Sequence, residues 1–243
     1  MYEAPLFLPA GDQALVVELG DEIDADVNRR VHNLAQLVEV GDIPGVVDLI
    51  PTYRSLLVQY DITRTSLSAL QGALLKLCGD HGEQTLERPR VVHIPTLYGG
   101  DYGPDLLFVA EHGGLTSDEV VSVHSEAEYL VYMMGFTPGF PYLGGLDERL
   151  ASPRLPTPRQ EIPAGSVGIA ESQTGVYPIA SPGGWRLIGR TPVVLFDPLR
   201  EPPSLVAAGD YVRFTPLGGE EEYAEVLGQA ESGEYQVTVT TRQ

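Results

Sequence analysis

Lysine is almost absent from this chain of 243 residues, and positive charge is scarce overall. Lys76 is the single lysine, and 15 basic residues face 34 acidic ones, for a net charge of −19. Nucleic acids and anionic membrane surfaces bind clustered basic side chains, so this balance argues against both as partners. Leu77 and Cys78 follow Lys76, which excludes the lysine-serine/threonine ending of a phosphate-binding loop.

Cysteine is represented by Cys78 alone. One thiol forms neither an intrachain disulfide nor a thiolate metal site, which is typical of a reducing compartment. The chain also has no apolar run near the ~20 residues of a membrane span, and its first residues are acidic where a signal peptide is basic. We therefore expect a cytoplasmic protein.

Complete catalytic signatures are missing as well. The five histidines show no HExxH spacing and no close pair, and Ala164 stands where a GxSxG nucleophile at Ser166 needs glycine. No glycine fingerprint of a dinucleotide site follows a predicted strand. The sequence therefore predicts neither a metal site nor self-sufficient catalysis.

The N-terminal part of the chain alternates short strands and helices. The predicted order is a strand, a helix, two strands, a helix and a strand, at residues 14–19, 24–40, 46–51, 55–60, 65–79 and 91–94. This order is the ferredoxin-like arrangement of an α/β domain, and Asp24 is the predicted cap of its first helix. A polar segment at residues 82–90 marks the boundary between a first domain, residues 1–85, and a second domain, residues 86–243.

The second domain begins with helices and continues as strands. Residues 104–112 have a helical pattern, and Thr116 with Glu119 forms a capping box for a helix that ends near His124. Strands are predicted at residues 129–134, 166–170, 175–179, 185–189, 193–196, 211–215, 222–227 and 235–241. Short strands punctuated by glycine and proline are typical of a barrel or sandwich, so the expected fold class is α+β.

Residues 135–192 concentrate glycine, proline and arginine. Five arginines face four acids there, which makes the segment +1 (5 − 4) in an acidic chain. Arginine suits bidentate recognition of carboxylate or phosphate, so this segment is the predicted site of an anionic ligand. The arginines near its turns are Arg154, Arg159, Arg186 and Arg190. Pairing of these side chains with the surplus acids of the chain is the open alternative.

Two rigid loops of this segment combine tight turns with aromatic side chains. They are Pro138–Tyr142 and Ser181–Trp185, which suit either a ligand cleft or aromatic packing at a barrel corner. Gln173 and Tyr177 flank a glycine and can either bind a polar ligand or stabilise the turn. His124, at a helix C-terminus, is a candidate for proton transfer or carboxylate binding.

Several motifs in this region closely resemble those of one family. They read HSEAEYLVYMMGFTPGFPYLGGL, PRLPTPRQEIPAGSVGIAESQTGVYPIASPGGWRLIGRTP, LFDP and GDYVRF, with YGGDYGPDL and GDQALVVELG upstream. The chain is similar to the family of 5-oxoprolinase B subunits, also called KipI or allophanate hydrolase subunit 1, over about residues 5–217.

The resemblance implies a ferredoxin-like first domain and a cyclophilin-like β-barrel as the second. It implies the B component of an ATP-dependent 5-oxoprolinase, which converts 5-oxo-L-proline to L-glutamate only together with the A and C subunits. Which of the three holds the ATP stays open. Two alternatives remain: an inhibitor of a sensor histidine kinase, and a carboxyltransferase component of urea metabolism.

The resemblance also implies roles for individual residues. His124, Arg159 and Arg190 are the catalytic candidates, for proton transfer and for stabilising charge on a phosphorylated lactam oxygen. The candidates for substrate binding are Tyr129, Phe136, Pro138, Gly139, Phe140, Arg154, Ser166, Gln173, Tyr177, Ser181, Gly184 and Trp185.

Two features depart from the family pattern. Glu171 and Ser172 stand where many relatives have glycine before the glutamine, so this turn is expected to differ. Residues 217–243 run beyond the usual end, and alternating Tyr235, Val237 and Val239 predict an added strand or hairpin for contact with a partner.

Overall fold

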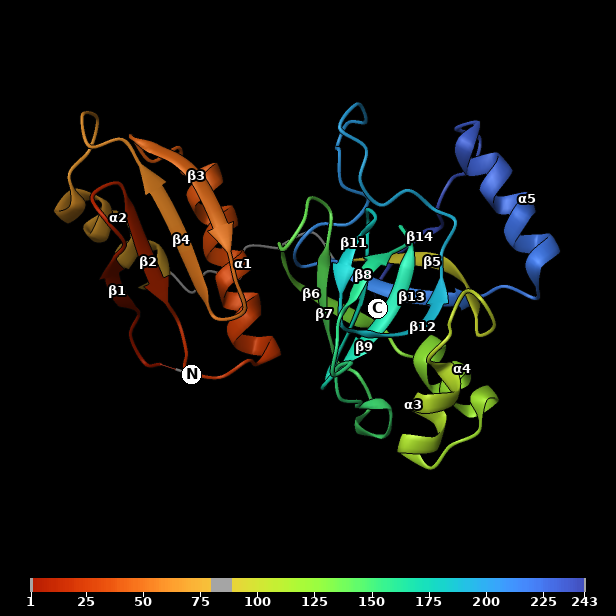
Figure 1. Ribbon diagram of the computed structural model, residues 1–243. Helices are drawn as coiled ribbons and strands as arrows, with labels where there is room; N and C mark the ends of the chain where they lie inside the picture. The colour runs from red at the N-terminus through yellow and green to blue at the C-terminus, as the bar shows by residue number, and fades with distance from the viewer. Residues whose placement is uncertain (1, 80–88, 243) are drawn as a thin grey trace. The chain divides into compact units, whose positions relative to one another are not determined.

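The computed structural model describes residues 2–79 and 89–242 (Figure 1). The chain divides into two compact units, residues 1–87 and 88–243, and each has its own apolar core. The boundary predicted between residues 85 and 86 lies outside the described residues. None of the helices in the described ranges has the length and apolar character needed to cross a membrane.

The first unit is a four-stranded antiparallel sheet with two helices packed on it (Figure 1). Alternate residues of the central strands, such as Leu15 and Val58, are fully buried against the apolar faces of the helices. The strands lie in the order β1 (Leu6–Pro9), β2 (Ala14–Glu18), β4 (Ser55–Tyr60) and β3 (Val46–Pro51), and the helices are α1 (Ala25–Val40) and α2 (Leu67–Gly79).

The strand that was expected to complete the first unit belongs to the second. Residues 91–94 lie in β5 (Arg90–Tyr98), which pairs with strands of the second unit, so their assignment to the ferredoxin-like order was wrong. The edge position beside β2 is taken by β1, which the sequence did not predict. Four residues are too few for a period-two pattern to stand out.

Both predicted helix caps are confirmed. Asp24 Oδ1 accepts hydrogen bonds from the backbone of Asp26 and Val27, at 2.9 and 3.0 Å, and so opens α1. The capping box at the start of α4 (Ser117–Glu126) is reciprocal. Thr116 Oγ1 accepts from the backbone of Glu119 at 3.2 Å, and Glu119 Oε2 accepts from the backbone of Thr116 at 2.8 Å.

The second unit is built on a closed barrel of seven strands, which settles the choice between barrel and sandwich in this α+β protein. Strands β5 and β13 run parallel, and the other neighbours are antiparallel. The barrel closes where β5 pairs with β12. Around it lie β12 (Arg186–Arg190), β9 (Ser166–Ala170), β10 (Gln173–Val176), β7 (Pro141–Gly144), β6 (Tyr129–Met134), β13 (Tyr211–Pro216) and β5.

Short elements cover the barrel. Helix α3 (Leu106–Gly113) contacts β12 and the 3-10 turn Glu148–Leu150, and α4 contacts β13. A separate two-stranded ribbon consists of β8 (Arg159–Ile162) and β11 (Ser181–Gly183). These additions carry or border most of the residues that the sequence singled out.

The C-terminal segment differs from the prediction. Residues 222–227, predicted as a strand, lie in helix α5 (Glu220–Glu231), whose three leading glutamates favour a helix N-terminus. Residues 235–241 form a strand only at β14 (Val239–Thr241), which pairs with β5 of the barrel. Residues 193–196 contribute one isolated bridge and no strand. Short apolar runs do not distinguish helix, strand and packed loop by themselves.

Gly103 permits a close approach between the turn before α3 and strand β12. A Cβ at this position would lie 2.0 Å from the carbonyl oxygen of Ile188 and 2.7 Å from the backbone nitrogen of Gly99, neither of which can rotate away. We expect Gly103→Ala to lower the free energy of unfolding of the second unit by about 2–3 kcal/mol. Urea unfolding followed by the fluorescence of Trp185, the single tryptophan, measures it.

Gly228→Ala is the control, because a Cβ there meets nothing within 4 Å and the position is inside α5. We expect it to raise stability by about 0.5–1 kcal/mol. Equal unfolding midpoints for the Gly103 variant and the unmodified chain would contradict the close approach.

Candidate functional site

Apolar side chains pack most of the barrel interior, which favours a ligand site outside it. Val131, Leu143 and Ile169 are among the fully buried residues of this core. A second, smaller cluster lies apart from that core and contains Phe140, Tyr177 and Trp185. We call these three residues, with the partly buried Tyr142, the outer aromatic cluster.

The outer aromatic cluster packs edge to face. The ring centroid of Phe140 lies 5.2 Å from that of Tyr142, 5.5 Å from that of Tyr177 and 5.7 Å from that of Trp185, all in T-shaped arrangements. Gly175 makes this possible, because a Cβ there would lie 3.1 Å from the indole and 3.3 Å from the Phe140 ring. The structure thus brings together three aromatic residues predicted from separate motifs.

The loop before Phe140 is held in an unusual backbone conformation. Phe136 has a left-handed φ of 65° and is 63% exposed, while its ring lies 5.5 Å from that of Phe140. A bulky residue in this region is a strained choice. Gly139 has φ 79°, and a Cβ there would come within 2.5 Å of the Phe196 side chain, so only glycine fits. Pro138 is exposed between them.

Arg159 lies beside the outer aromatic cluster and is held by a buried acid. Its Nη2 donates to both carboxylate oxygens of Asp105, at 3.1 and 2.9 Å, and its Nη1 donates to the Trp185 carbonyl at 3.3 Å. Arg186 Nη1 lies 3.8 Å from the same carboxylate, and its guanidinium stacks 3.5 Å above the Phe108 ring. The expected pairing of arginines with acids therefore applies to both.

Tyr177 connects the aromatic cluster to the arginines. Burial raises the pKa of its hydroxyl to about 12, whereas a hydrogen bond from the Trp185 backbone and the charges of Arg154 and Arg159 act in the opposite direction. Arg154 is exposed, and no carboxylate in residues 2–79 or 89–242 forms an ion pair with it. The site thus has one positioned arginine and one that is available to an anion.

The turn between β11 and β12 ties these parts together. The Gly184 carbonyl accepts from the Leu155 backbone at 2.7 Å, which fixes the loop that carries Arg154. Ser181 Oγ is buried and has no hydrogen-bond partner in the described ranges. Gln173 lies at the opposite end of β10 from Tyr177, about 13 Å away along an extended strand, so the structure does not bring these two together.

Arg190 occupies a different place from the other arginines. It ends β12, four residues and about 13 Å along the strand from Arg186. Its guanidinium lies 5.4 Å from the centroid of the Tyr102 ring, and Nη2 is 3.5 Å from the Asp101 carbonyl. Its cross-strand neighbour is Ser166 on β9. The predicted arginine cluster is therefore divided into two parts.

Ser166 and Arg190 also share an unusual property. Ser166 Oγ and Arg190 Nε are both buried, and neither has a hydrogen-bond partner among the residues that the structure describes. Buried polar groups normally have partners, so unpaired ones in a native fold call for an explanation such as a ligand. Both residues were singled out by the sequence.

His124 and Tyr129 lie in the barrel core instead of the outer cluster. The His124 ring is 0% exposed, between Tyr98 Oη and Thr174 Oγ1, each at 2.8 Å. Because the Thr174 hydroxyl donates to the Gly168 carbonyl, His124 is the neutral tautomer with its proton on Nε2. Tyr129 Oη donates to the His124 carbonyl at 2.9 Å.

This placement decides the charge of His124. The end of helix α4 would favour an imidazolium, but burial lowers the pKa of His124 from 6.5 to about 3. Its predicted catalytic role stays a prediction, and in this conformation the ring does not reach solvent.

Sequence reasoning missed Asp105. It is the N-cap of α3, where an aspartate ordinarily caps its own helix, yet its carboxylate makes no capping bond. No local pattern indicates that this side chain turns toward β8 and β12 instead. The family motif YGGDYGPDL includes Asp105 itself, but the contact with β8 and β12 is a tertiary one that the motif does not reveal.

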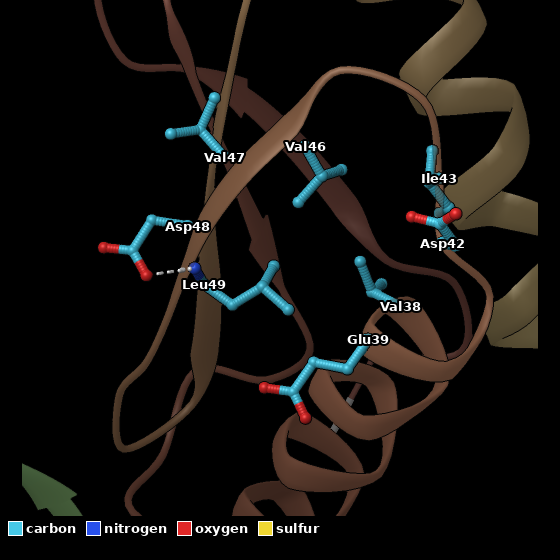
Figure 2. Close-up of a pocket in the computed structure, with 8 residues that line it drawn as sticks. All are labelled: Val38, Glu39, Asp42, Ile43, Val46, Val47, Asp48 and Leu49. Atoms are coloured by element: carbon cyan, nitrogen blue, oxygen red, sulfur yellow. Dashed lines mark hydrogen bonds between the residues drawn. The ribbon is translucent and has the colours of Figure 1, made fainter.

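A pocket of about 260 Å³ lies in the first unit, and none of the predicted site residues is among those that line it (Figure 2). It is lined by aliphatic side chains together with the acidic residues Glu39, Asp42 and Asp48. Asp48 Oδ1 accepts from the Leu49 backbone at 2.8 Å. This negative lining opposes an anionic ligand, so the pocket is not the predicted site.

Comparison with known proteins places the chain in a family. Residues 5–206 match the model of a protein family that is described as "carboxyltransferase domain, subdomain C and D". A 5-oxoprolinase B subunit of Bacillus subtilis (strain 168) is 44% identical over 224 residues, which are 88% of this chain and 93% of that protein. The 5-oxoprolinase B subunit of Escherichia coli O157:H7 is 46% identical over 208 residues, with 85% and 93% covered.

Other relatives are informative in different ways. The crystal structure of the conserved uncharacterized protein PH0987 from Pyrococcus horikoshii is 48% identical, with a TM-score of 0.54, and 90% of this chain matches 100% of that chain. A urea amidolyase of Lachancea kluyveri is 27% identical, and this chain covers 14% of it.

The chain therefore belongs to the family of carboxyltransferase domains with subdomains C and D. Within that family it groups with the 5-oxoprolinase B subunits, as the resemblance in its motifs indicated.

The buried, neutral His124 makes stability depend on pH. Above pH 6.5 the ring is neutral in both states. As the pH falls from 6.5 toward 3, the unfolded chain binds a proton that the folded chain excludes, so stability decreases. The expected slope is about 1.4 kcal/mol per pH unit relative to a variant without the ring.

Urea unfolding of the unmodified chain and of His124→Gln between pH 4.5 and 8 measures this difference. The stability advantage of the unmodified chain should shrink steadily below pH 6.5. Parallel pH profiles for the two proteins would mean that the ring is accessible and titrates normally.

Proposed function

We propose that this chain is the B subunit of an ATP-dependent 5-oxoprolinase, which converts 5-oxo-L-proline to L-glutamate together with the A and C subunits. The observation that carries the proposal is the 44–46% identity to two 5-oxoprolinase B subunits, over 93% of each. The protein acts in the cytoplasm as part of a heteromer. The ferredoxin-like and cyclophilin-like fold names that the family implies are part of the same proposal.

The geometry of the second unit suits a small carboxylic acid. Arg154 is exposed without an acidic partner in the described ranges, and the Asp105–Arg159 pair holds a second guanidinium beside Tyr177. Arginine forks bind carboxylate with two parallel hydrogen bonds. Phe140, Tyr177 and Trp185 are at most 7% exposed, so within the outer aromatic cluster it is the partly buried Tyr142 that offers apolar surface to the ring of 5-oxoproline.

The same charges suit the transition state. A lactam is a stable amide, and negative charge develops on its oxygen when the ring is opened. A preorganised guanidinium stabilises such charge without rearranging, because its position is already fixed. Arg159 is fixed in this way by Asp105 and the Trp185 carbonyl, and Arg154 binds the carboxylate.

The nucleotide fits a partner protein better than this chain. ATP supplies the phosphoryl group that activates the lactam. Lys76 is the single lysine and belongs to the first unit, and no three His, Cys, Asp or Glu side chains within residues 2–79 and 89–242 are grouped to hold a metal ion. We therefore place the ATP on the C subunit or at its interface with this chain.

The description of the family favours a second candidate, a carboxyltransferase component of urea metabolism. Against it, the urea amidolyase is 27% identical, and the 5-oxoprolinase proteins are much nearer. The identity of neighbouring genes separates the two, because a biotin carboxylase gene beside this one favours the second, and a gene for the 5-oxoprolinase A subunit favours the first.

A kinase inhibitor would slow autophosphorylation of a cognate histidine kinase, and no feature of the described residues favours it.

Reconstitution with the A and C subunits tests the proposal and its main residue. Arg154→Ala should lower kcat/KM for 5-oxoproline by about 10- to 100-fold, the cost of one charge-assisted hydrogen-bonded contact. The assay is release of glutamate, coupled to ATP consumption.

Arg149→Ala is the control, because Arg149 is an exposed arginine of the same unit whose partner is Asp147, at 2.7 Å. Its turnover should match that of the unmodified complex. Absence of ATP-dependent glutamate formation in the unmodified complex would refute the function, and equal losses in both variants would refute the role of Arg154.

A further inference from the structure

Asp105 connects three segments that are far apart in the sequence. Its backbone N–H donates to the Leu187 carbonyl at 2.8 Å, and its Oδ2 accepts from the Leu187 N–H at 2.7 Å. The same carboxylate accepts both hydrogen bonds from Arg159 Nη2. One side chain at the start of α3 therefore aligns β12 and β8.

The carboxylate of Asp105 is mostly buried and accepts hydrogen bonds from Arg159 and from the Leu187 backbone. Its side chain is 10% exposed, and a buried carboxylate is stable only when donors surround it. With Arg186 at 3.8 Å, the local charge is two arginines against one aspartate, or +1. Asp105 thus positions Arg159 without cancelling the attraction of this surface for an anion.

Arg159 keeps donors that Asp105 does not use. A guanidinium has five N–H donors, of which Nη2 faces Asp105 and Nη1 faces the Trp185 carbonyl. Because both terminal nitrogens are fixed, the plane of the fork is fixed as well. Without the Asp105 carboxylate, the 3.3 Å contact with the Trp185 carbonyl is the one remaining hydrogen bond of the Arg159 guanidinium within the described residues.

We propose that Asp105 is a positioning residue of the anion site, acting through Arg159. The proposal rests on the function proposed above, because Arg159 is taken as the group that meets the developing charge. It goes beyond that function in assigning a role to a residue at a helix start, where an aspartate ordinarily only caps the helix.

Asp210 provides a close internal control. Its side chain is 9% exposed, and it accepts hydrogen bonds from Arg90 Nε at 3.0 Å, from Arg90 Nη2 and from the Ala207 backbone at 2.8 Å. It is thus a second buried aspartate of the same unit with an arginine and a backbone donor. None of these partners is a predicted site residue.

The experiment compares Asp105→Asn, Asp210→Asn, Arg159→Ala and the double variant Asp105→Asn/Arg159→Ala in the reconstituted complex. Both asparagine variants should lower Tm, because each removes a buried charge from its arginine. Only Asp105→Asn should lower kcat/KM, by about 10- to 100-fold, since misplacing a catalytic group by about 1 Å has this effect. In the Arg159→Ala background the Asp105 substitution should have no further effect on kcat/KM.

Two outcomes would overturn the proposal. One is unchanged kcat/KM in a folded Asp105→Asn complex, and the other is a double variant whose losses are the product of the single losses. Should Asp105→Asn fail to fold, Asp105→Glu keeps the charge and moves the carboxylate by one methylene. The proposal then requires impaired kcat/KM in that variant, and unimpaired values would sink it.

A readout on the chain alone separates this proposal from the proposed function. Trp185 is the single tryptophan, and its backbone carbonyl accepts a hydrogen bond from Arg159. A displacement of Arg159 therefore changes the surroundings of this residue, and the fluorescence emission of its indole reports the change. Asp105→Asn should shift that emission to longer wavelength, and Asp210→Asn should not. If the unmodified complex lacks turnover, the function fails, while the emission still decides whether Asp105 positions Arg159. Equal spectra would overturn that role.

Discussion

Closure of the barrel between β5 and β12 is the constraint on which the candidate site depends. Two residue pairs, Gly189 with Tyr98 and Arg190 with Leu97, form this seam. Glycine is required at position 189 of this seam, because a Cβ there would lie 2.8 Å from the Leu97 carbonyl oxygen. Strand β12 is thereby fixed at both ends, by the seam at one and by Asp105 at the other. The positions of Arg186 and Arg190, the partly exposed residues at its two ends, are fixed as a result.

A barrel interior packed with apolar side chains favours a candidate site outside the barrel. The core takes up the histidine that looked most suited to proton transfer, and its burial keeps that ring neutral. Outside that core, buried aromatic rings form a second cluster, and the charges of Arg154 and Arg159 act on its member Tyr177. Guanidinium groups suit the recognition of an anion, which is the role proposed for Arg154 and Arg159. This division agrees with a protein that needs partners to complete a reaction.

The sequence predicted several elements correctly, for reasons that are local. The caps at Asp24 and Thr116 involve residues two or three apart, so their signals are complete within one turn. Most predicted strands of the barrel and the clustering of glycine and arginine were also visible. Helix α5 was wrongly predicted as a strand. Tyr223 is its buried residue, so the sequence carries no clear helical period of apolar residues there. The edge strand β1 was too brief to show any period.

The sequence by itself determined the composition of the site: arginines, aromatic residues and tight turns within residues 135–192, and a family resemblance that the comparisons confirm. Only the tertiary structure decided which of these residues meet. It separated Arg190 from Arg159, withdrew His124 into the core and recruited Asp105 from a helix start. The physical reason is that barrel closure and burial of charge depend on contacts between distant segments, such as the one that spans 82 residues from Asp105 to β12, which no local pattern encodes.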